Sequence, residues 1–337
     1  MGLTLRSSKK DIMKAKLNYL YSYTGKARGV DPDNAREYIR SGWVPAPKTV
    51  LIGRKKVVRS QLKPFPHLSK NLPTVLEKTL LSSMGSLKGL PRTMMFSGGF
   101  DSTLMVLLAR RYGAQVKAVT IQFDKFNPMT VGGAVSLAKK LGLSHQVLHV
   151  TAKEFLNSFE LVSQITEEPL LDLDLALVNA VFKKYHQQRG KEVFISGMGS
   201  DQWFGNMALE PEYGGLQTRL DTGLLNKKAH DQVAELYGNR FIFPFLSAPM
   251  LALSLRLTDD MKDDKKLLRT LADGNGLNPQ HGREEQVPGM MRKVVVKAFA
   301  QRAWPWPLSE EKQQKTDDQT LRQIALGLWL KNQKVTR

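Results

Sequence analysis

Between residues 93 and 195 the chain alternates short apolar segments with helical segments, and no other feature constrains its fold as strongly. The apolar, strand-like segments are Thr93–Phe96, Val116–Phe123, His145–Val150 and Glu192–Ile195. The helical segments between them are Ser102–Tyr112, which ends at Gly113, Val131–Leu141, which ends at Gly142, and Leu175–Gln188. Strands separated by helices of this length are typical of βαβ units, so the sequence predicts a doubly wound parallel α/β sheet.

The remaining sequence divides around this alternation. We expect a basic N-terminal appendage over residues 1–63, a nucleotide-binding α/β domain over 64–205, and a mostly helical lobe over 206–337. Beyond residue 205 the chain is rich in helical segments and shows no strand comparable to the earlier ones. A chain of 337 residues is long enough for one large domain or two modest ones.

Charge and cysteine content limit the functional classes. The net charge is +19, and residues 1–63 hold fifteen basic side chains against only Asp11, Asp31, Asp33 and Glu37. Such a field favours polyanions, although a solvated basic surface explains it equally well because no RNA-binding motif accompanies it. The absence of cysteine excludes disulfides, thiolate metal sites and persulfide or thioester chemistry on this chain.

No membrane segment is expected. The apolar run Ile242–Leu255 is interrupted by Pro244 and Pro249 and is shorter than the roughly 20 residues of a membrane span. The start of the chain is basic and lacks the apolar core of a secretory signal. We therefore expect a cytoplasmic protein.

The loop after the first strand predicts a phosphate site. Its glycine and polar residues are Ser97, Gly98, Gly99, Asp101, Ser102 and Thr103. The two glycines let the backbone turn sharply, and the hydroxyls stand at a helix N-terminus, where the helix dipole favours an anion. Asp101 would repel a bare phosphate, so its position makes sense if Mg²⁺ lies between the carboxylate and a nucleotide. A plain helix-capping turn is the alternative, but the full string after a strand favours the phosphate site.

The string S-G-G-F-D-S at 97–102 resembles the signature of the PP-loop ATP pyrophosphatases. It lacks the G-x-x-x-x-G-K-S/T pattern of loops whose enzymes cleave the γ-phosphate. The resemblance implies that the loop grips the β,γ-pyrophosphate of ATP and that AMP is transferred to an oxygen of the substrate. It also implies that the strand Ala118–Phe123, with Ile121, offers its backbone edge to adenine.

A second motif, residues 193–205, resembles the asparagine synthetase pattern S-G-x-G-S-D-E-x-F-G-G after a strand. This resemblance implies that Ser196, Gly197 and Met198 line the nucleotide and that Asp201 is a second Mg²⁺ carboxylate opposite Asp101. Weaker likenesses at Tyr38–Thr49 and Arg240–Leu246 extend the similarity to about residues 30–300. The chain is thus similar to a stand-alone synthetase domain of the asparagine synthetase type.

The departures from that pattern concern nitrogen supply and catalysis. Without cysteine the chain lacks the catalytic residue of a glutaminase domain, so nitrogen would come from free ammonia, a substrate amine or a separate glutaminase. Met198 stands where the family has an acid, and Gln202 replaces another acid. The family's catalytic lysine has no counterpart in the stretch beginning at Arg283, so we expect Arg283 to act in its place, with Arg292 and Lys293 as alternatives.

The sequence therefore predicts an ATP- and Mg²⁺-dependent, AMP-forming carbon–nitrogen ligase. It would adenylate a carboxylate or amide oxygen of a small molecule or peptide for attack by an amine or ammonia. Two alternatives stay open: a PP-loop enzyme that adenylates a base in tRNA, with RNA as a less favoured partner, and a nucleotide-binding homologue without catalysis. Asp172 and Asp174 precede the predicted helix that begins at Leu175. Capping of that helix explains the two carboxylates at least as well as substrate binding does.

Overall fold

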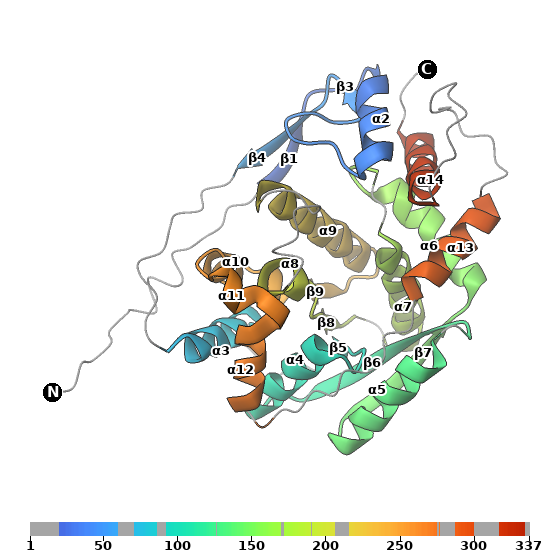
Figure 1. The fold of residues 1–337 in the computed structure, drawn as a ribbon. Coiled ribbons are helices and arrows are strands. Elements are labelled where there is room, and N and C mark those ends of the chain that lie inside the picture. The colour runs from blue at the N-terminus through green and yellow to red at the C-terminus, as the bar shows by residue number, and fades with distance from the viewer. Residues whose placement is uncertain are drawn as a thin grey trace.

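A computed structural model describes residues 20–59, 71–85, 92–125, 127–169, 172–189, 191–205, 216–274, 276, 287–299 and 317–333 (Figure 1). At its centre lies a five-stranded sheet in the order β7-β6-β5-β8-β9, and every pairing is parallel. The strands are β5 (Arg92–Met95), β6 (Val116–Phe123), β7 (Ser144–Val150), β8 (Val193–Ile195) and β9 (Arg240–Ile242). The predicted parallel α/β sheet is confirmed.

The strand order places a topological switch point beside β5. The chain first adds β6 and β7 on one side of β5 and then returns to add β8 and β9 on the other side. Met94 of β5 consequently pairs with Ala118 of β6 and with Ile195 of β8. Open parallel sheets bind ligands at the carboxyl ends of the strands where the order reverses, so the fold itself marks the edge beyond β5 and β8.

Helices cover the sheet and extend beyond it. Those of the central region are α3 (Leu72–Ser83), α4 (Phe100–Arg111), α5 (Pro128–Lys140), α6 (Ala152–Ile165), α7 (Leu173–Arg189), α8 (Ser200–Phe204) and α9 (Leu216–Leu236). Later in the chain come η3 (Pro244–Leu246), α10 (Ala248–Ser254), α11 (Asp259–Lys262), η4 (Asp263–Lys265), α12 (Lys266–Gly274), α13 (Val287–Phe299) and α14 (Asp317–Asn332). Helices α5 and α7 lie on opposite sides of β6 and β7 (Figure 1). None of the described helices combines the length and the apolar character that crossing a bilayer requires.

One expectation about the later part of the chain is wrong. Residues 240–242 form β9, which lies parallel to β8 with Ile195 opposite Ile242, although no comparable strand was expected beyond residue 205. β8 is equally short, but a glycine-rich loop follows it and marks the end of a strand, whereas β9 is followed by Phe243 and Pro244. Pairing with β8, rather than a local signal of this kind, makes β9 a strand.

The N-terminal segment, residues 20–59, packs against the rest of the described chain through its helix, which contacts α14. It contains the antiparallel pair β1 (Leu20–Thr24) and β4 (Lys55–Arg59), the pair β2 (Gly29–Val30) and β3 (Leu51–Ile52), and helix α2 (Pro32–Ser41). Buried side chains of α2, such as Tyr38 and Ile39, share a small core with Leu326 and Trp329 of α14. Helix α14 also packs against α6, so the two ends of the described chain meet on the main body.

Candidate functional site

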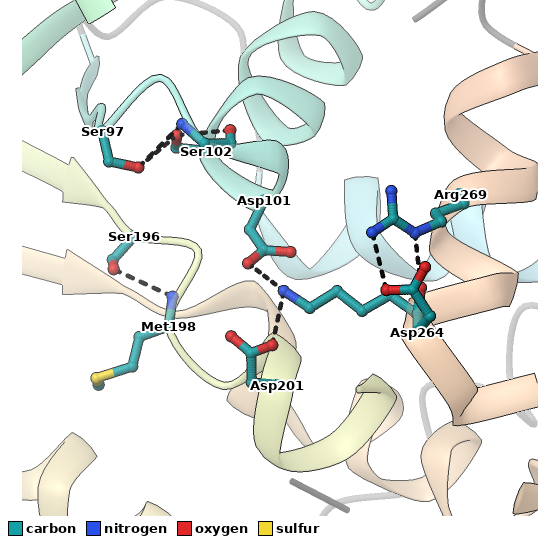
Figure 2. A network of polar contacts seen from close by, with 10 residues as sticks. Ser97, Asp101, Ser102, Ser196, Met198, Asp201, Asp264 and Arg269 are labelled. Atoms are coloured by element: carbon teal, nitrogen blue, oxygen red, sulfur yellow. Dashed lines mark hydrogen bonds and ion pairs between the residues drawn. The ribbon is translucent and has the colours of Figure 1, made fainter. Parts of the chain in front are cut away.

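The first loop at the switch point runs from β5 into α4, as the sequence predicts. Gly98 has a φ of +76°, and a Cβ on it would lie 2.9 Å from the Cα of Ala134 in α5, so only glycine fits there. Ser97 Oγ accepts a hydrogen bond from the Gly99 amide (3.2 Å) and lies 3.2 Å from Ser102 Oγ (Figure 2). The hydroxyls and the first amides of α4 therefore gather at one point, where a helix N-terminus favours an anion.

The second loop runs from β8 into α8 and packs against the first. The Ser196 amide donates to the carbonyl of Ile242 (3.1 Å), and the Met198 amide donates to Ser196 Oγ (3.2 Å). A Cβ on Gly197 would lie 3.1 Å from Asp101 Cβ, so a small residue allows the two loops to approach. Gly199 has a φ of +100° and lies against Leu246. Figure 2 shows the Met198 side chain directed away from the carboxylates.

Two carboxylates from these loops face a single ammonium group. Lys265 Nζ lies 2.7 Å from Asp101 Oδ2 and 2.8 Å from Asp201 Oδ1 (Figure 2). Burial raises the pKa of Asp101, while the charge of Lys265 works in the opposite direction. For Lys265 burial lowers the pKa, but the two carboxylates more than compensate, so its net pKa is raised. Lys265 is thus held as a cation, and Asp101 and Asp201 converge on one point.

The donor set suits Mg²⁺ that arrives with phosphates. Asp101 Oδ1 is buried and has no hydrogen-bond partner within the described residues, which leaves a hard oxygen ligand unused. In the same described part of the chain, no group of three or more His, Cys, Asp or Glu side chains could hold a metal by itself. Mg²⁺ is commonly bound by one or two carboxylates together with phosphate oxygens and waters. The pair Asp101 and Asp201 fits that mode of binding.

Lys265 is not among the residues that the sequence predicts for the site. The predicted cation, Arg283, lies outside the described residues, so its role stays a prediction; of the two alternatives, Arg292 pairs with Asp318 at 2.7 Å. The structure brings Lys265 to the site from the short turn η4, which contacts α8. Neither glycine nor a recognised motif marks residues 263–266, and their charges suggest only the start of an exposed helix. The sequence pattern therefore held no usable signal for Lys265.

The remaining predicted residues take these places. Thr103 is buried in the first turn of α4. Ile121 lies near the end of β6, and its carbonyl accepts a hydrogen bond from Asn127 Nδ2 at 3.0 Å. A contact between this strand and adenine stays a prediction. At the start of α7, Asp172 Oδ1 accepts a hydrogen bond from the Leu175 amide at 3.0 Å, which is the capping role considered above.

Comparisons with known proteins support the resemblance to asparagine synthetases seen in the motif at residues 193–205. Residues 84–235 match the family model described as asparagine synthase. A provisionally named glutamine-hydrolyzing asparagine synthetase of Mycobacterium tuberculosis is 30% identical over 116 residues, which cover 34% of this chain and 18% of that protein. "Asparagine synthetase (glutamine-hydrolyzing) 1" of Bacillus subtilis is 22% identical over 205 residues, 54% of this chain and 32% of that one. The matched regions thus span a third or less of these relatives.

Among solved structures, a "predicted subunit of tRNA methyltransferase" from Methanocaldococcus jannaschii is similar with a TM-score of 0.30 and 15% identity. The match covers 59% of this chain and 94% of that chain.

Proposed function

We propose that this chain, whose residues 84–235 match the asparagine synthase family model, is an ATP-dependent ligase that forms AMP and pyrophosphate. Its acceptor would be a carboxylate or amide oxygen, which is adenylated and then displaced by an amine or ammonia. The observation that carries the proposal is the convergence of Asp101 and Asp201, from two loops at the switch point, on a common cation. A phosphate-binding loop next to paired carboxylates is what nucleotide activation requires.

In the first step, an oxygen of the acceptor attacks the α-phosphorus of ATP, the bond to the bridging oxygen breaks, and pyrophosphate leaves. Ser97, Ser102 and the amides at the start of α4 would hold the pyrophosphate part. Mg²⁺, held by Asp101 and Asp201, would neutralise the phosphate charges when bound. Lys265 would stabilise the negative charge that develops on the oxygens around phosphorus.

In the second step, the unprotonated nitrogen attacks the activated carbon, the carbon–oxygen bond to AMP breaks, and the proton that the nitrogen then releases passes to the departing AMP phosphate or to water. A protonated amine would first need a base, and Met198, at the position of the family's acid, has no group that could accept a proton. We therefore propose that the amine arrives unprotonated and that an amine on the substrate is its source. The rate of amide formation should then rise with pH until the amine is fully deprotonated.

The test is incubation with ATP, Mg²⁺ and pools of candidate acceptors, with AMP and pyrophosphate measured by mass spectrometry. Asp101→Asn and Asp201→Asn should each lower AMP formation at least ~10²-fold, because each removes a carboxylate that would hold the Mg²⁺ neutralising the reacting phosphates. Asp260→Asn is the matched control, since Asp260 pairs with Lys266 at an exposed position on α11. Formation of ADP instead of AMP would contradict the proposed chemistry.

A second candidate keeps the adenylation chemistry but takes a base in RNA as acceptor. It is favoured by four exposed cations of the N-terminal segment, Lys26, Arg28, Lys48 and Lys55, that make no ion pair among the described residues. Phosphate contacts by such cations make RNA affinity fall steeply with salt. RNA binding that is absent, or that does not respond to salt, would remove this candidate.

A further inference from the structure

We propose that Arg269 is a positioning residue that fixes the turn carrying Lys265, and so sets where its ammonium meets Asp101 and Asp201. Arg269 does not touch either carboxylate in the described structure. It acts through Asp264, as Figure 2 shows, and through the ring of Phe100. The inference deepens the proposed function and rests on it, since it assigns a residue that supports the same site.

The turn that carries Lys265 has an unusual backbone. Asp264 has a φ of +44° and Lys265 a φ of +57°, the left-handed region that L-residues other than Asn and Asp seldom adopt. Two consecutive residues in this region persist only when their surroundings enforce the conformation. This backbone conformation brings the Lys265 side chain between helices α4 and α8, where it meets both carboxylates. Something beyond local preference must therefore hold the turn.

Arg269 supplies that restraint from the first turns of α12. Its Nε donates to the carbonyl of Asp264 at 2.7 Å, and its Nη2 donates to Asp264 Oδ1 at 3.0 Å. One planar guanidinium thereby holds both the backbone and the side chain of the residue before Lys265, a grip that a lysine cannot reproduce. The helix itself is anchored, because Leu267, Leu268 and Leu271 are buried.

The same guanidinium connects the turn to the phosphate loop. Arg269 Cζ lies 5.2 Å from the centre of the Phe100 ring, and Lys265 Nζ lies 5.9 Å from it. Phe100 is buried, is the first residue of α4 and directly precedes Asp101. Both cations thus lie over one ring beside the first carboxylate, within the range of cation–π attraction. Phe100 occupies the variable position x of the S-G-G-x-D-S string, and through these contacts it would help to align Lys265 with Asp101.

The contact between Arg269 and Asp264 is suited to positioning Lys265 rather than to stabilising the fold. Asp264 is 74% exposed, and exposed ion pairs contribute little to the free energy of folding. The neighbouring pair of Lys266 with Asp260 is exposed at 60% and 75% and joins side chains only, so it restrains no backbone. Lys266→Met is therefore a control that removes a nearby positive charge but leaves the turn intact.

The decisive variant is Arg269→Lys, which keeps the charge and loses the two-pronged grip. The first measurement is the affinity for Mn²⁺ in the absence of nucleotide, determined by electron paramagnetic resonance. It reports on the position of Lys265, because an ammonium group between two carboxylates opposes the binding of a second cation there. We expect Lys265→Met to tighten Mn²⁺ binding roughly tenfold, Arg269→Lys to tighten it at least about threefold, and Lys266→Met to change it less than about twofold. Asp264→Asn, which tolerates the left-handed conformation, should act like Arg269→Lys but more weakly.

The second measurement is AMP formation. Arg269→Lys should lower kcat roughly 10- to 100-fold, with the KM for ATP changed less than about threefold, because misplacement by about 1 Å can cost that much. Wild-type Mn²⁺ affinity and kcat in Arg269→Lys would overturn the proposal, as would unchanged Mn²⁺ affinity in Lys265→Met. If the wild-type chain forms no AMP with any acceptor but the Mn²⁺ pattern holds, the proposed function fails and the positioning role of Arg269 stands.

Discussion

The ion pair between Lys56 and Glu168 joins the N-terminal segment to the main body, and its disruption is a quantitative test of the structure. Lys56 Nζ lies 2.6 Å from Glu168 Oε2, and the two side chains are 0% and 8% exposed. Lys56 also donates to the carbonyl of Val44. Removing one partner of a buried pair leaves a charge without compensation, so we expect Lys56→Met to cost about 3 to 5 kcal/mol of unfolding free energy at pH 7.

The cost should depend on pH in a defined direction. Burial already raises the pKa of Glu168, and Lys56 is the main influence that opposes the rise. Without Lys56 the folded-state pKa rises further above the unfolded value, so the carboxyl group takes up a proton more readily in the folded chain. A raised acid pKa favours the folded state at low pH, and this gain is lost as pH rises through the folded pKa. The cost of Lys56→Met should therefore be smaller at pH 5 than at pH 7, by at most about 1.4 kcal/mol per pH unit.

Urea denaturation at both pH values, with hydrogen exchange of residues 31–59 as a local probe, measures this cost. Replacing both partners by methionine should cost less than either single change, because no buried charge then remains. Lys227→Met is the control, since Lys227 pairs with Asp231 at a site where both side chains are 33% exposed, and we expect less than about 1 kcal/mol. A Lys56→Met cost that is below about 1 kcal/mol at pH 7, or equal at both pH values, would refute the reasoning.

Three further predictions concern single sites. Gly98→Ala should lower the thermal midpoint more than Gly113→Ala. Both glycines have a positive φ, but only a Cβ on Gly98 would meet backbone, at 2.9 Å. We expect a loss of unfolding free energy above about 2 kcal/mol for Gly98→Ala and near 1 kcal/mol for Gly113→Ala. Desolvation by the surrounding chain and the charge of Asp172 raise the pKa of Asp174 to about 6, although the residue is exposed at the surface, so stability should fall modestly between pH 4 and pH 7. Asp174→Asn should remove at most about 1 kcal/mol of that fall in urea titrations, because solvent screens an exposed carboxyl group. Trp329→Phe removes the hydrogen bond from Nε1 to the Thr166 carbonyl (2.8 Å), so it should cost about 1 to 2 kcal/mol in urea denaturation and speed hydrogen exchange in α2.

The sequence predicted the parts of the fold that leave a local pattern. β5 to β8 each coincide with an apolar run, and Gly113 and Gly142 follow the helices α4 and α5, so the parallel sheet was predictable from local patterns and spacing. β9 left no such pattern, because its three residues become a strand only through pairing with β8. The contact of α14 with α2 was equally hidden, since Trp329 and Tyr38 are far apart in sequence and belong to segments expected in different regions.

The candidate site likewise contains residues that the sequence predicts, Asp101 and Asp201, and one that it does not, Lys265. Asp101 and Asp201 were predictable because each follows a strand, and β5 and β8 are paired, with Met94 opposite Ile195; sheet hydrogen bonds therefore set how the two carboxylates approach. Lys265 comes from a turn 164 residues after Asp101, where neither backbone preference nor a motif favours its conformation. Its position depends on two hydrogen bonds from Arg269 and on the ring of Phe100. Substitutions around α12 should consequently move the cation while the carboxylates stay in place, which separates the two halves of the site by experiment.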